Sequence, residues 1–213
     1  MHNTTTQNSH MPIRTAYRMT HISNIPHIME HGFVLPDSQY ASTDYKPIGD
    51  TDIIRKRHDV IKGIDLRKYV HFYFGIRTPM LYVIQNGYNG VTKQNAEDIV
   101  YCEISLVRLY RSDKYFVFSN GHILSAITQI FTKNDIPQID SIIQEHDIYA
   151  KYWNNADDPD LKRKKEAELL IMGDTPPDII TRLIVFNQSA KERLDAFNCV
   201  NVPISINPDY YFQ

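Results

Sequence analysis

Glu-Ala-Glu-Leu-Leu-Ile, residues 166–171, is the stretch from which the fold of this chain is best predicted, because its alternation is typical of a β-strand. Glu166 and Glu168 would then point to one face, while the apolar side chains at 167, 169 and 171 pack on the other. Glutamate is depleted in strands, and two like charges on one face repel each other. Either one glutamate faces a cleft and stabilises developing positive charge, or the strand is a solvated edge. Spacing alone favours the solvated edge, since exposed charges are the ordinary case.

Four consecutive cations, Lys162–Lys165, lead directly into this strand, and a second basic cluster lies at Arg55–His58. Because the net charge of the chain is only -2, both clusters concentrate positive potential locally. Each cluster is either a track for phosphate groups or a solvated helix face, and spacing alone slightly favours the helix face. The Lys162–Lys165 run matters more, because a catalytic acid beside a cationic run suits a polyanionic substrate.

Strand and helix candidates alternate at first and then come in short runs, which predicts a mixed sheet flanked by helices. We expect strands at residues 17–20, 70–74, 99–107, 115–118, 166–171, 182–186 and 202–206, and helices at 25–31, 53–58, from 79 onward, 123–131, 136–153 and 189–197. Ser23 or Asn24 can cap the first of these helices, Gly32 ends it, and Ser189 can cap the last. Residues 36–50 form a long loop, and such loops are usually functional or disordered.

Length and composition predict one globular domain over residues 11–213, preceded by a disordered tail at residues 1–10. The chain has 213 residues, of which 42% are hydrophobic and 23% charged, so a sizeable core can form. Its two cysteines form no CxxC pair and its histidines show no metal-ligand spacing, so we expect no disulfide framework and no metal. No apolar run approaches about 18 residues, which favours a cytoplasmic protein without a membrane span.

Three further polar positions are candidates for a site. Tyr73 lies on the face of its strand opposite Phe72 and Phe74, so it either looks into a cleft or is an amphipathic core tyrosine. Thr78 can cap the helix after it, whose amino end favours anions. His122 lies in a turn, where most histidines are merely exposed. The chain contains no P-loop, GxGxxG or GxSxG, which excludes the common nucleotide-binding and serine-hydrolase motifs.

Three segments, taken in order, resemble the DarT family of DNA ADP-ribosyltransferase toxins from bacterial toxin–antitoxin systems. They are residues 17–25 (YRMTHISNI), residues 72–82 (FYFGIRTPMLY) and residues 164–170 (KKEAELL). The second segment is the most distinctive, and the residues 209–212 (DYYF) also fit. The resemblance covers roughly residues 15–213, and the ordered set carries more weight than any single motif.

The resemblance implies an α+β ADP-ribosyltransferase fold, in which a split mixed β-sheet flanked by helices holds NAD in a central cleft. It implies that Glu168 is the catalytic glutamate and Arg57 the second catalytic residue, in an NAD-binding loop and helix over residues 40–59. NAD contacts are implied for Arg18, Met19, Thr20, His27, Leu35, Arg57 and Tyr73. DNA-binding or base-positioning roles are implied for Met80, His122, Lys164, Lys165 and Glu166.

The implied activity is transfer of ADP-ribose from NAD, a co-substrate, to a base of single-stranded DNA, with release of nicotinamide. Thymine N3 is the preferred acceptor, and Arg57 either assists removal of its proton or stabilises the deprotonated base. Guanine, RNA or a terminal phosphate is an alternative acceptor, and a nucleic-acid-binding module without catalysis is a further alternative. The resemblance also implies a toxin with a macrodomain antitoxin as partner.

Overall fold

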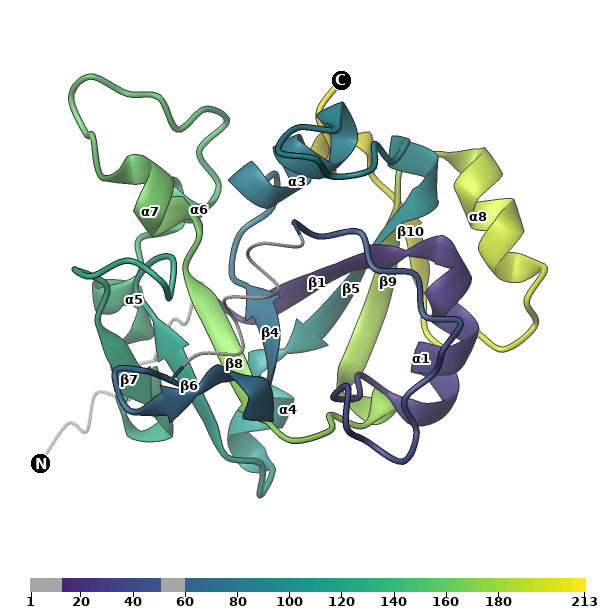
Figure 1. The fold of residues 1–213 in the computed structure, drawn as a ribbon, viewed down its shortest axis with the longest axis horizontal. Helices are drawn as coiled ribbons and strands as arrows, with labels where there is room; N and C mark the ends of the chain where they lie inside the picture. Colours follow the sequence, from purple (N-terminus) through teal and green to yellow (C-terminus); the bar gives the residue numbers. More distant parts are fainter. Residues whose placement is uncertain (1–12, 51–59) are drawn as a thin grey trace, which may run out of the picture.

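The computed structural model describes residues 13–50 and 60–213. Figure 1 shows a sheet with helices gathered around both of its ends. The tail expected at residues 1–10, the helix expected at 53–58 and the catalytic candidate Arg57 lie outside the described residues. Those assignments therefore stay predictions, as does a single catalytic domain over residues 11–213.

Eight strands form one large sheet with the order β10-β9-β5-β1-β4-β8-β6-β7. These strands are β1 (Thr15–His21), β4 (Tyr69–Tyr73), β5 (Ile99–Ser105), β6 (Phe116–Ser119), β7 (Ile130–Thr132), β8 (Glu168–Met172), β9 (Ile180–Val185) and β10 (Ile204–Ile206). A separate hairpin consists of β2 (Val60–Ile61) and β3 (Ile64–Asp65). Neighbours in the large sheet are antiparallel except β9 and β10, which are parallel. The sheet is therefore mixed, as predicted.

The sheet is split between β1 and β4. β1 pairs with β5 along its whole length, from Thr15 opposite Ser105 to His21 opposite Ile99. With β4 it shares only the pair Tyr17 and Tyr73. In Figure 1, β1 runs across the view whereas β4 and β8 run down it. The expected split mixed sheet is confirmed, and the divergence of the two strands opens a space between the halves.

Short helices cover the two halves of the sheet. They are α1 (Ile25–His31), α3 (Pro79–Asn86), α4 (Leu106–Arg111), α5 (Ile139–Ile142), α6 (Glu145–Ile148), α7 (Leu161–Lys165) and α8 (Gln188–Asp195). Short 3₁₀ helices occur at Ile22–Asn24, Leu66–Lys68, Ala96–Asp98, Lys133–Gln138, Pro177–Ile179 and Pro208–Tyr210. Figure 1 places α1 and α8 beside the β9–β10 half, and α5, α6 and α7 beside the β6–β7–β8 half. No helix among the described residues is long and apolar enough to cross a bilayer.

The ends of two helices follow from local sequence. Pro26 lies in the first turn of α1, and Gly32 ends it with a φ of 78°, a conformation that favours glycine. The hydroxyl of Thr78 accepts a hydrogen bond from the backbone N–H of Leu81 at 3.4 Å, which caps α3 as expected. In α8 the cap is Asn187 and not Ser189, because the Asn187 side chain accepts from the N–H of Ala190 at 3.0 Å.

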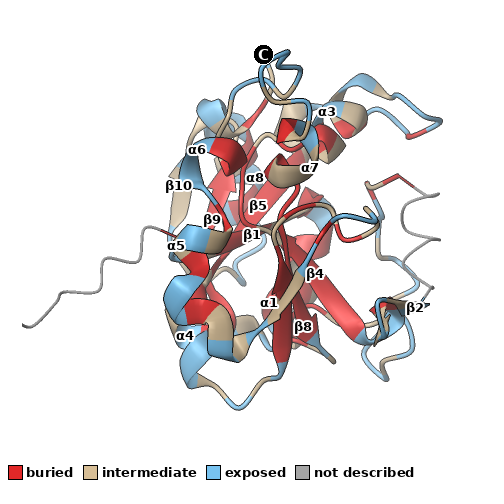
Figure 2. Cartoon of the chain, turned by 90° about the vertical axis from the view of Figure 1, so that its left-hand side faces the viewer, coloured by how far each residue is buried: buried red, intermediate tan, exposed pale blue. Residues whose placement is uncertain are grey.

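β8 lies inside the sheet, between β4 and β6, so the prediction of a solvated edge strand is wrong. Leu169 and Ile171 belong to the same core cluster as Val70 and Phe72, which confirms the apolar faces assigned to both strands. Figure 2 shows β1, β4 and β8 as buried strands, with exposed residues on the surrounding helices and loops.

Two of the predicted long helices are wrong. The helix expected over 123–131 does not form. Its end belongs to the strand β7, Ile130–Thr132, which pairs with β6 at the edge of the sheet. The region 136–153 contains only the two single-turn helices α5 and α6, after a 3₁₀ turn with Pro137 inside it. The break lies at Ile143, which follows α5 in an extended conformation with φ of -121° and ψ of 121°.

The basic run Lys162–Lys165 forms most of α7, and its last member lies inside the protein. Lys165 is 0% exposed, and its ammonium donates to the carbonyl oxygens of Ile76 and Ile148, each at 3.1 Å. Burial, helped by the positive charge of Arg77, lowers the pKa of Lys165 to about 8. The expected role of Lys165 in DNA contact disagrees with this burial. Its ammonium instead ties α7 to the segment after β4 and to the end of α6.

We predict that Lys165 makes stability depend on pH above neutrality. Between about pH 8 and its ordinary value of 10.5, the unfolded chain holds a proton on Lys165 that the folded chain does not. The contribution of Lys165 to the free energy of unfolding is therefore lowest below pH 8 and rises with pH from about 8 to 10.5. Relative to Lys165→Met, the wild-type free energy of unfolding should increase by about 2 kcal/mol from pH 7.5 to pH 10.

Denaturant unfolding of both chains at each pH measures this difference. Lys162→Met is the matched control, because Lys162 is an exposed lysine on the same helix. If the free energy of unfolding depends on pH in the same way for the wild type and Lys165→Met, folding does not change the pKa of Lys165.

Candidate active site

A cavity of about 110 Å³ lies where β1 and β4 diverge. Residues from both strands, from α3 and from the 36–50 loop line it. They are Arg18, Met19, Tyr45, Pro47, Ile48, Gly49, His71, Tyr73, Met80 and Ile84. Four residues that the sequence assigned to NAD or the base, Arg18, Met19, Tyr73 and Met80, thus meet at one cavity.

Arg18 spans the gap between the two halves of the sheet. Its Nη1 donates to the carbonyl oxygen of His71 at 2.7 Å, and its guanidinium lies 5.8 Å from the centre of the Phe33 ring. Because β1 and β4 share a single residue pair, this side chain supplies a link that backbone hydrogen bonds supply elsewhere. The arginine therefore shapes the cavity wall and lines it.

The loop over residues 36–50 is attached to the end of β1 by side chains. The amide of Asn24 donates to the carbonyl of Lys46 and accepts from its N–H, both at 2.9 Å. Lys46 Nζ lies 2.9 Å from Nε2 of His21, whose pKa is lowered by burial and by the charge of Lys46. A neutral His21 can accept from that ammonium. Thr20 does not line the cavity, and its hydroxyl lies 3.5 Å from that of Tyr45.

Glu168 is 1% exposed and does not line the cavity itself. Its Oε2 lies 3.1 Å from Nδ1 of His71, which does line the cavity, and its Oε1 accepts from the N–H of Ile123 at 3.0 Å. Nδ1 of His122 lies 3.6 Å from Oε1. Glu168 stands opposite Tyr73 in the register of β4 and β8, so His71 is its diagonal neighbour on the same face. The carboxylate is therefore one side chain away from the cavity, with both oxygens held.

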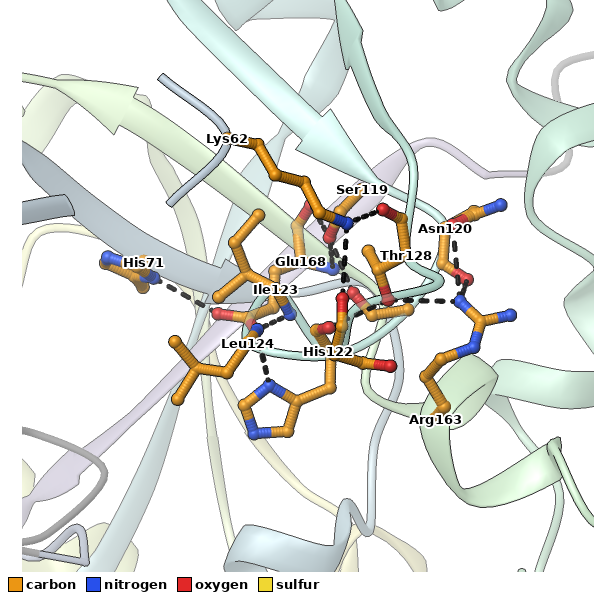
Figure 3. A network of polar contacts seen from close by, with 12 residues as sticks. Lys62, His71, Ser119, Asn120, His122, Ile123, Leu124, Thr128, Arg163 and Glu168 are labelled. Carbon is orange, nitrogen blue, oxygen red and sulfur yellow. Dashed lines mark hydrogen bonds and ion pairs between the residues drawn. The ribbon is translucent and has the colours of Figure 1, made fainter. Parts of the chain in front are cut away.

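The connection between β6 and β7, residues 119–129, brings His122 and Ile123 to the carboxylate (Figure 3). We call it the 119–129 segment. It is attached to β8 as well, because the hydroxyl of Ser119 accepts from the N–H of Glu168 at 3.2 Å. The resemblance gave His122 a base-positioning role, which stays a prediction; in the structure His122 is a neighbour of Glu168.

Glu166 does not belong to the strand. It follows the last turn of α7 with φ of -98° and ψ of 28°, and its N–H donates to the carbonyl of Arg163. The expected pair of glutamates on one strand face is therefore wrong, because the helix extends to the residue before it and β8 begins only at Glu168. Glu166 is nevertheless buried, with 6% of its surface exposed.

The remaining candidates lie away from this cavity. His27 bonds through Nε2 to the carbonyl of Tyr40 at 2.7 Å, and the N–H of Leu35 donates to Asp174 at 2.8 Å. Lys164 pairs with Asp158 at 2.7 Å, and that carboxylate raises the lysine's pKa. Roles in NAD or DNA contact for these three stay predictions.

His71 and Ile84 line the cavity but were not among the residues singled out from the sequence. The signal for His71 was its position two residues before Tyr73, on the same polar face of β4. For Ile84 it was the spacing of four residues from Met80 on one helix face. The described residues hold no group of three or more histidine, cysteine or acidic side chains that could bind a metal.

Comparison with known proteins places these features in a family. The family model described as "ssDNA thymidine ADP-ribosyltransferase, DarT" matches residues 17–212. A DNA ADP-ribosyl transferase of Thermus sp. (strain 2.9) is 30% identical over 208 residues, which cover 92% of this chain and 95% of that one. A fusion of DNA ADP-ribosyl transferase and DNA ADP-ribosyl glycohydrolase from Thermosipho africanus is 29% identical over 203 residues. This match covers 93% of this chain but only 50% of the fusion protein, so the chain spans about half of that relative.

Solved structures agree with the sequence comparison. Thermus sp. 2.9 DarT in complex with carba-NAD+ superposes with a TM-score of 0.76 at 26% identity, covering 95% of this chain and 100% of that one. The same protein in complex with ADP-ribosylated ssDNA gives a TM-score of 0.77 at 26% identity, covering 95% and 98%. The predicted resemblance is confirmed: the chain belongs to the DarT family of single-stranded DNA thymidine ADP-ribosyltransferases.

Proposed function

We propose that this chain transfers ADP-ribose from NAD to a thymine base of single-stranded DNA and releases nicotinamide. The observation that carries the proposal is a buried carboxylate, Glu168, held one side chain behind a cavity in the split of the sheet. Membership of the DarT family supports the reaction, and a relative from Thermus has been solved with carba-NAD+ and with ADP-ribosylated ssDNA.

The cavity suits one end of a dinucleotide. Its volume of about 110 Å³ is below the roughly 300–1,000 Å³ that is usual for sites enclosing a whole drug-sized ligand. One ring therefore fits inside, against Met19, Tyr73 and Met80, and the rest of NAD would lie across the mouth beside residues 45–49. Nicotinamide is the ring that must leave, so we place it nearest to the carboxylate.

The reaction breaks the bond between the ribose carbon C1′ and the nicotinamide nitrogen, and the nitrogen takes the bonding electrons. The ribose becomes cationic as the ring leaves, and a fixed negative charge nearby stabilises that state. A preorganised group of this kind contributes about 10²–10³ in rate. The N–H of Ile123 and the ring of His71 hold the two oxygens of Glu168, so little reorganisation is needed when charge develops.

Thymine N3 would then attack C1′ and lose its proton. Paired bases hide this edge, so the substrate is single-stranded or unpaired. We propose that Arg57 assists this step, either in removing the proton or in stabilising the deprotonated base. His122 and the 119–129 segment lie on the side of Glu168 away from β4, which suits a role in placing the acceptor base.

We further propose that the chain acts as a toxin in the cytoplasm, beside a macrodomain partner that removes ADP-ribose from DNA. The relative from Thermosipho africanus carries a transferase and a glycohydrolase in one chain, and this supports such a pairing. The corresponding solved structure, Thermosipho africanus DarTG, holds ADP-ribose.

Glu168→Gln tests the role of the carboxylate. Glutamine keeps the shape and the acceptor for the N–H of Ile123 but removes the negative charge, so ADP-ribosylation of DNA should fall about 10²–10³-fold. The rate is measured from NAD and a single-stranded oligonucleotide. Glu192→Gln, on the exposed face of α8, is the matched control, and thermal unfolding shows whether each variant is folded. A folded Glu168→Gln protein that labels DNA near the wild-type rate would remove Glu168 from the mechanism.

The acceptor base is tested with paired oligonucleotides. We expect ADP-ribose on an oligonucleotide with one thymine, none on the same sequence with cytosine in that place, and a large loss of labelling when the complementary strand is annealed. Mass spectrometry of the digested product maps the modified base. Labelling of guanine, of the terminal phosphate or of RNA would instead assign the chain one of the other acceptors.

A further inference from the structure

Two cations from separate elements converge on the 119–129 segment (Figure 3). Arg163 belongs to α7, and Lys62 lies in the turn between β2 and β3. We propose that Arg163 and Lys62 are positioning residues, which hold this segment against Glu168 for the transfer reaction, and that Arg163 does not contact DNA phosphates. The inference rests on the proposed function and adds to it the residues that set the geometry of the acceptor side.

Arg163 is fixed at both ends of its guanidinium. Its Nε and Nη2 donate to the two carboxylate oxygens of Asp160 at 2.7 and 2.6 Å. Its Nη1 lies 3.1 Å from the carbonyl oxygen of Asn120, 3.3 Å from the Oδ1 of that residue and 3.2 Å from the hydroxyl of Thr128. The planar fork of arginine suits such a fixed arrangement. One side chain thus joins both ends of the 119–129 segment.

The backbone of the segment lies directly on Arg163. A Cβ added to Gly121 would stand 2.2 Å from Nη1 of Arg163 and 2.9 Å from its carbonyl oxygen. Only glycine leaves room for this approach. The N–H of His122 also donates to that carbonyl at 2.9 Å. Arg163 therefore contacts Gly121 and His122, the two residues that precede Ile123, and the N–H of Ile123 is bonded to Glu168.

Lys62 attaches the other side of the segment to the β2–β3 hairpin. Its ammonium donates to the carbonyl oxygens of Ser125, at 3.2 Å, and of Thr128. Thr128 donates in turn to the carbonyl of His122 at 2.8 Å. Both cations therefore donate to Thr128, and Thr128 is hydrogen-bonded to His122, the neighbour of Glu168.

These contacts leave little of Arg163 for nucleic acid, whereas Lys62 is an exposed residue. The Arg163 side chain is 14% exposed, and each of its three nitrogens already donates. A DNA phosphate would have to replace bonds that hold the segment in place. A displacement of about 1 Å in a catalytic arrangement can cost about 10²-fold in rate, so loss of the anchor should appear in kcat.

Steady-state kinetics of Arg163→Gln distinguish anchoring from phosphate contact. With NAD and a thymine-containing single-stranded oligonucleotide, we expect kcat to fall by about 10²-fold. The KM for the oligonucleotide, and its dependence on salt between about 50 and 200 mM, should stay as in the wild type. Arg67→Gln is the matched control, because it removes the same charge and breaks an exposed pair with Asp65, and it should keep the wild-type kcat.

The opposite pattern would overturn the proposal. An Arg163→Gln protein with wild-type kcat, a raised KM and a salt slope smaller by about 1 would show that Arg163 contacts a phosphate. Wild-type protein that labels no DNA would instead remove the proposed function. That failure is recognised separately, because the anchor has a readout that does not need activity.

That readout is hydrogen exchange at the N–H of Ile123, which is bonded to Glu168. We expect faster exchange there in Arg163→Gln, with exchange in β5 unchanged. Thr128→Val removes the hydroxyl on the segment side and leaves both cations, so it keeps the proposal testable if Arg163→Gln fails to fold. It should lower kcat in the same way, and the double variant should be no worse than Arg163→Gln alone. Unchanged exchange at Ile123, or strictly additive effects, would contradict a shared anchor.

Discussion

A buried negative charge is the constraint on which the rest of this structure depends. Removing a carboxylate from water costs several kcal/mol unless hydrogen bonds and charges compensate for the loss. Glu168 is compensated by the N–H of Ile123 and by the ring of His71. These partners come from the 119–129 segment and from β4, so a stable carboxylate requires both elements to meet at the start of β8. The catalytic proposal needs the same arrangement.

The divergence of β1 and β4 gives this charge a place to act. Because the strands share only one residue pair, a cavity forms at the centre of the sheet, where solvent is otherwise excluded. Arg18 keeps the two halves in contact across the gap. His71 has a part on both sides, since its carbonyl accepts from Arg18 and its ring meets Glu168. His71 therefore both lines the cavity and supports the carboxylate.

Periodicity predicted the parts of the fold that local sequence controls. The faces of β4 and β8, the end of α1 at Gly32 and the Thr78 cap of α3 follow from residues within a few positions, whereas Asn24 precedes α1 without a capping side-chain hydrogen bond. Long-range pairing decided the rest: residues 123–131 have helical spacing, but the end of this stretch joins the edge of the sheet in β7. For the basic run before Glu168, spacing left open a phosphate track and a solvated helix face and slightly favoured the latter. Arg163 and Lys165 instead use their charges inside the fold, where backbone carbonyls need donors. Sequence spacing cannot show such partners, whereas family motifs indicated the reaction and several cavity residues.

The central claim is that Glu168 stands beside the ribose carbon that becomes cationic, with the N–H of Ile123 still holding it. A crystal structure of this chain with carba-NAD+ tests that claim most directly. The account predicts nicotinamide between β1 and β4, a ribose hydroxyl or C1′ in contact with the carboxylate, and the hydrogen bond from Ile123 retained. A bound ligand with its ribose far from Glu168, or separated from it by an unmoved His71 ring, would contradict the account.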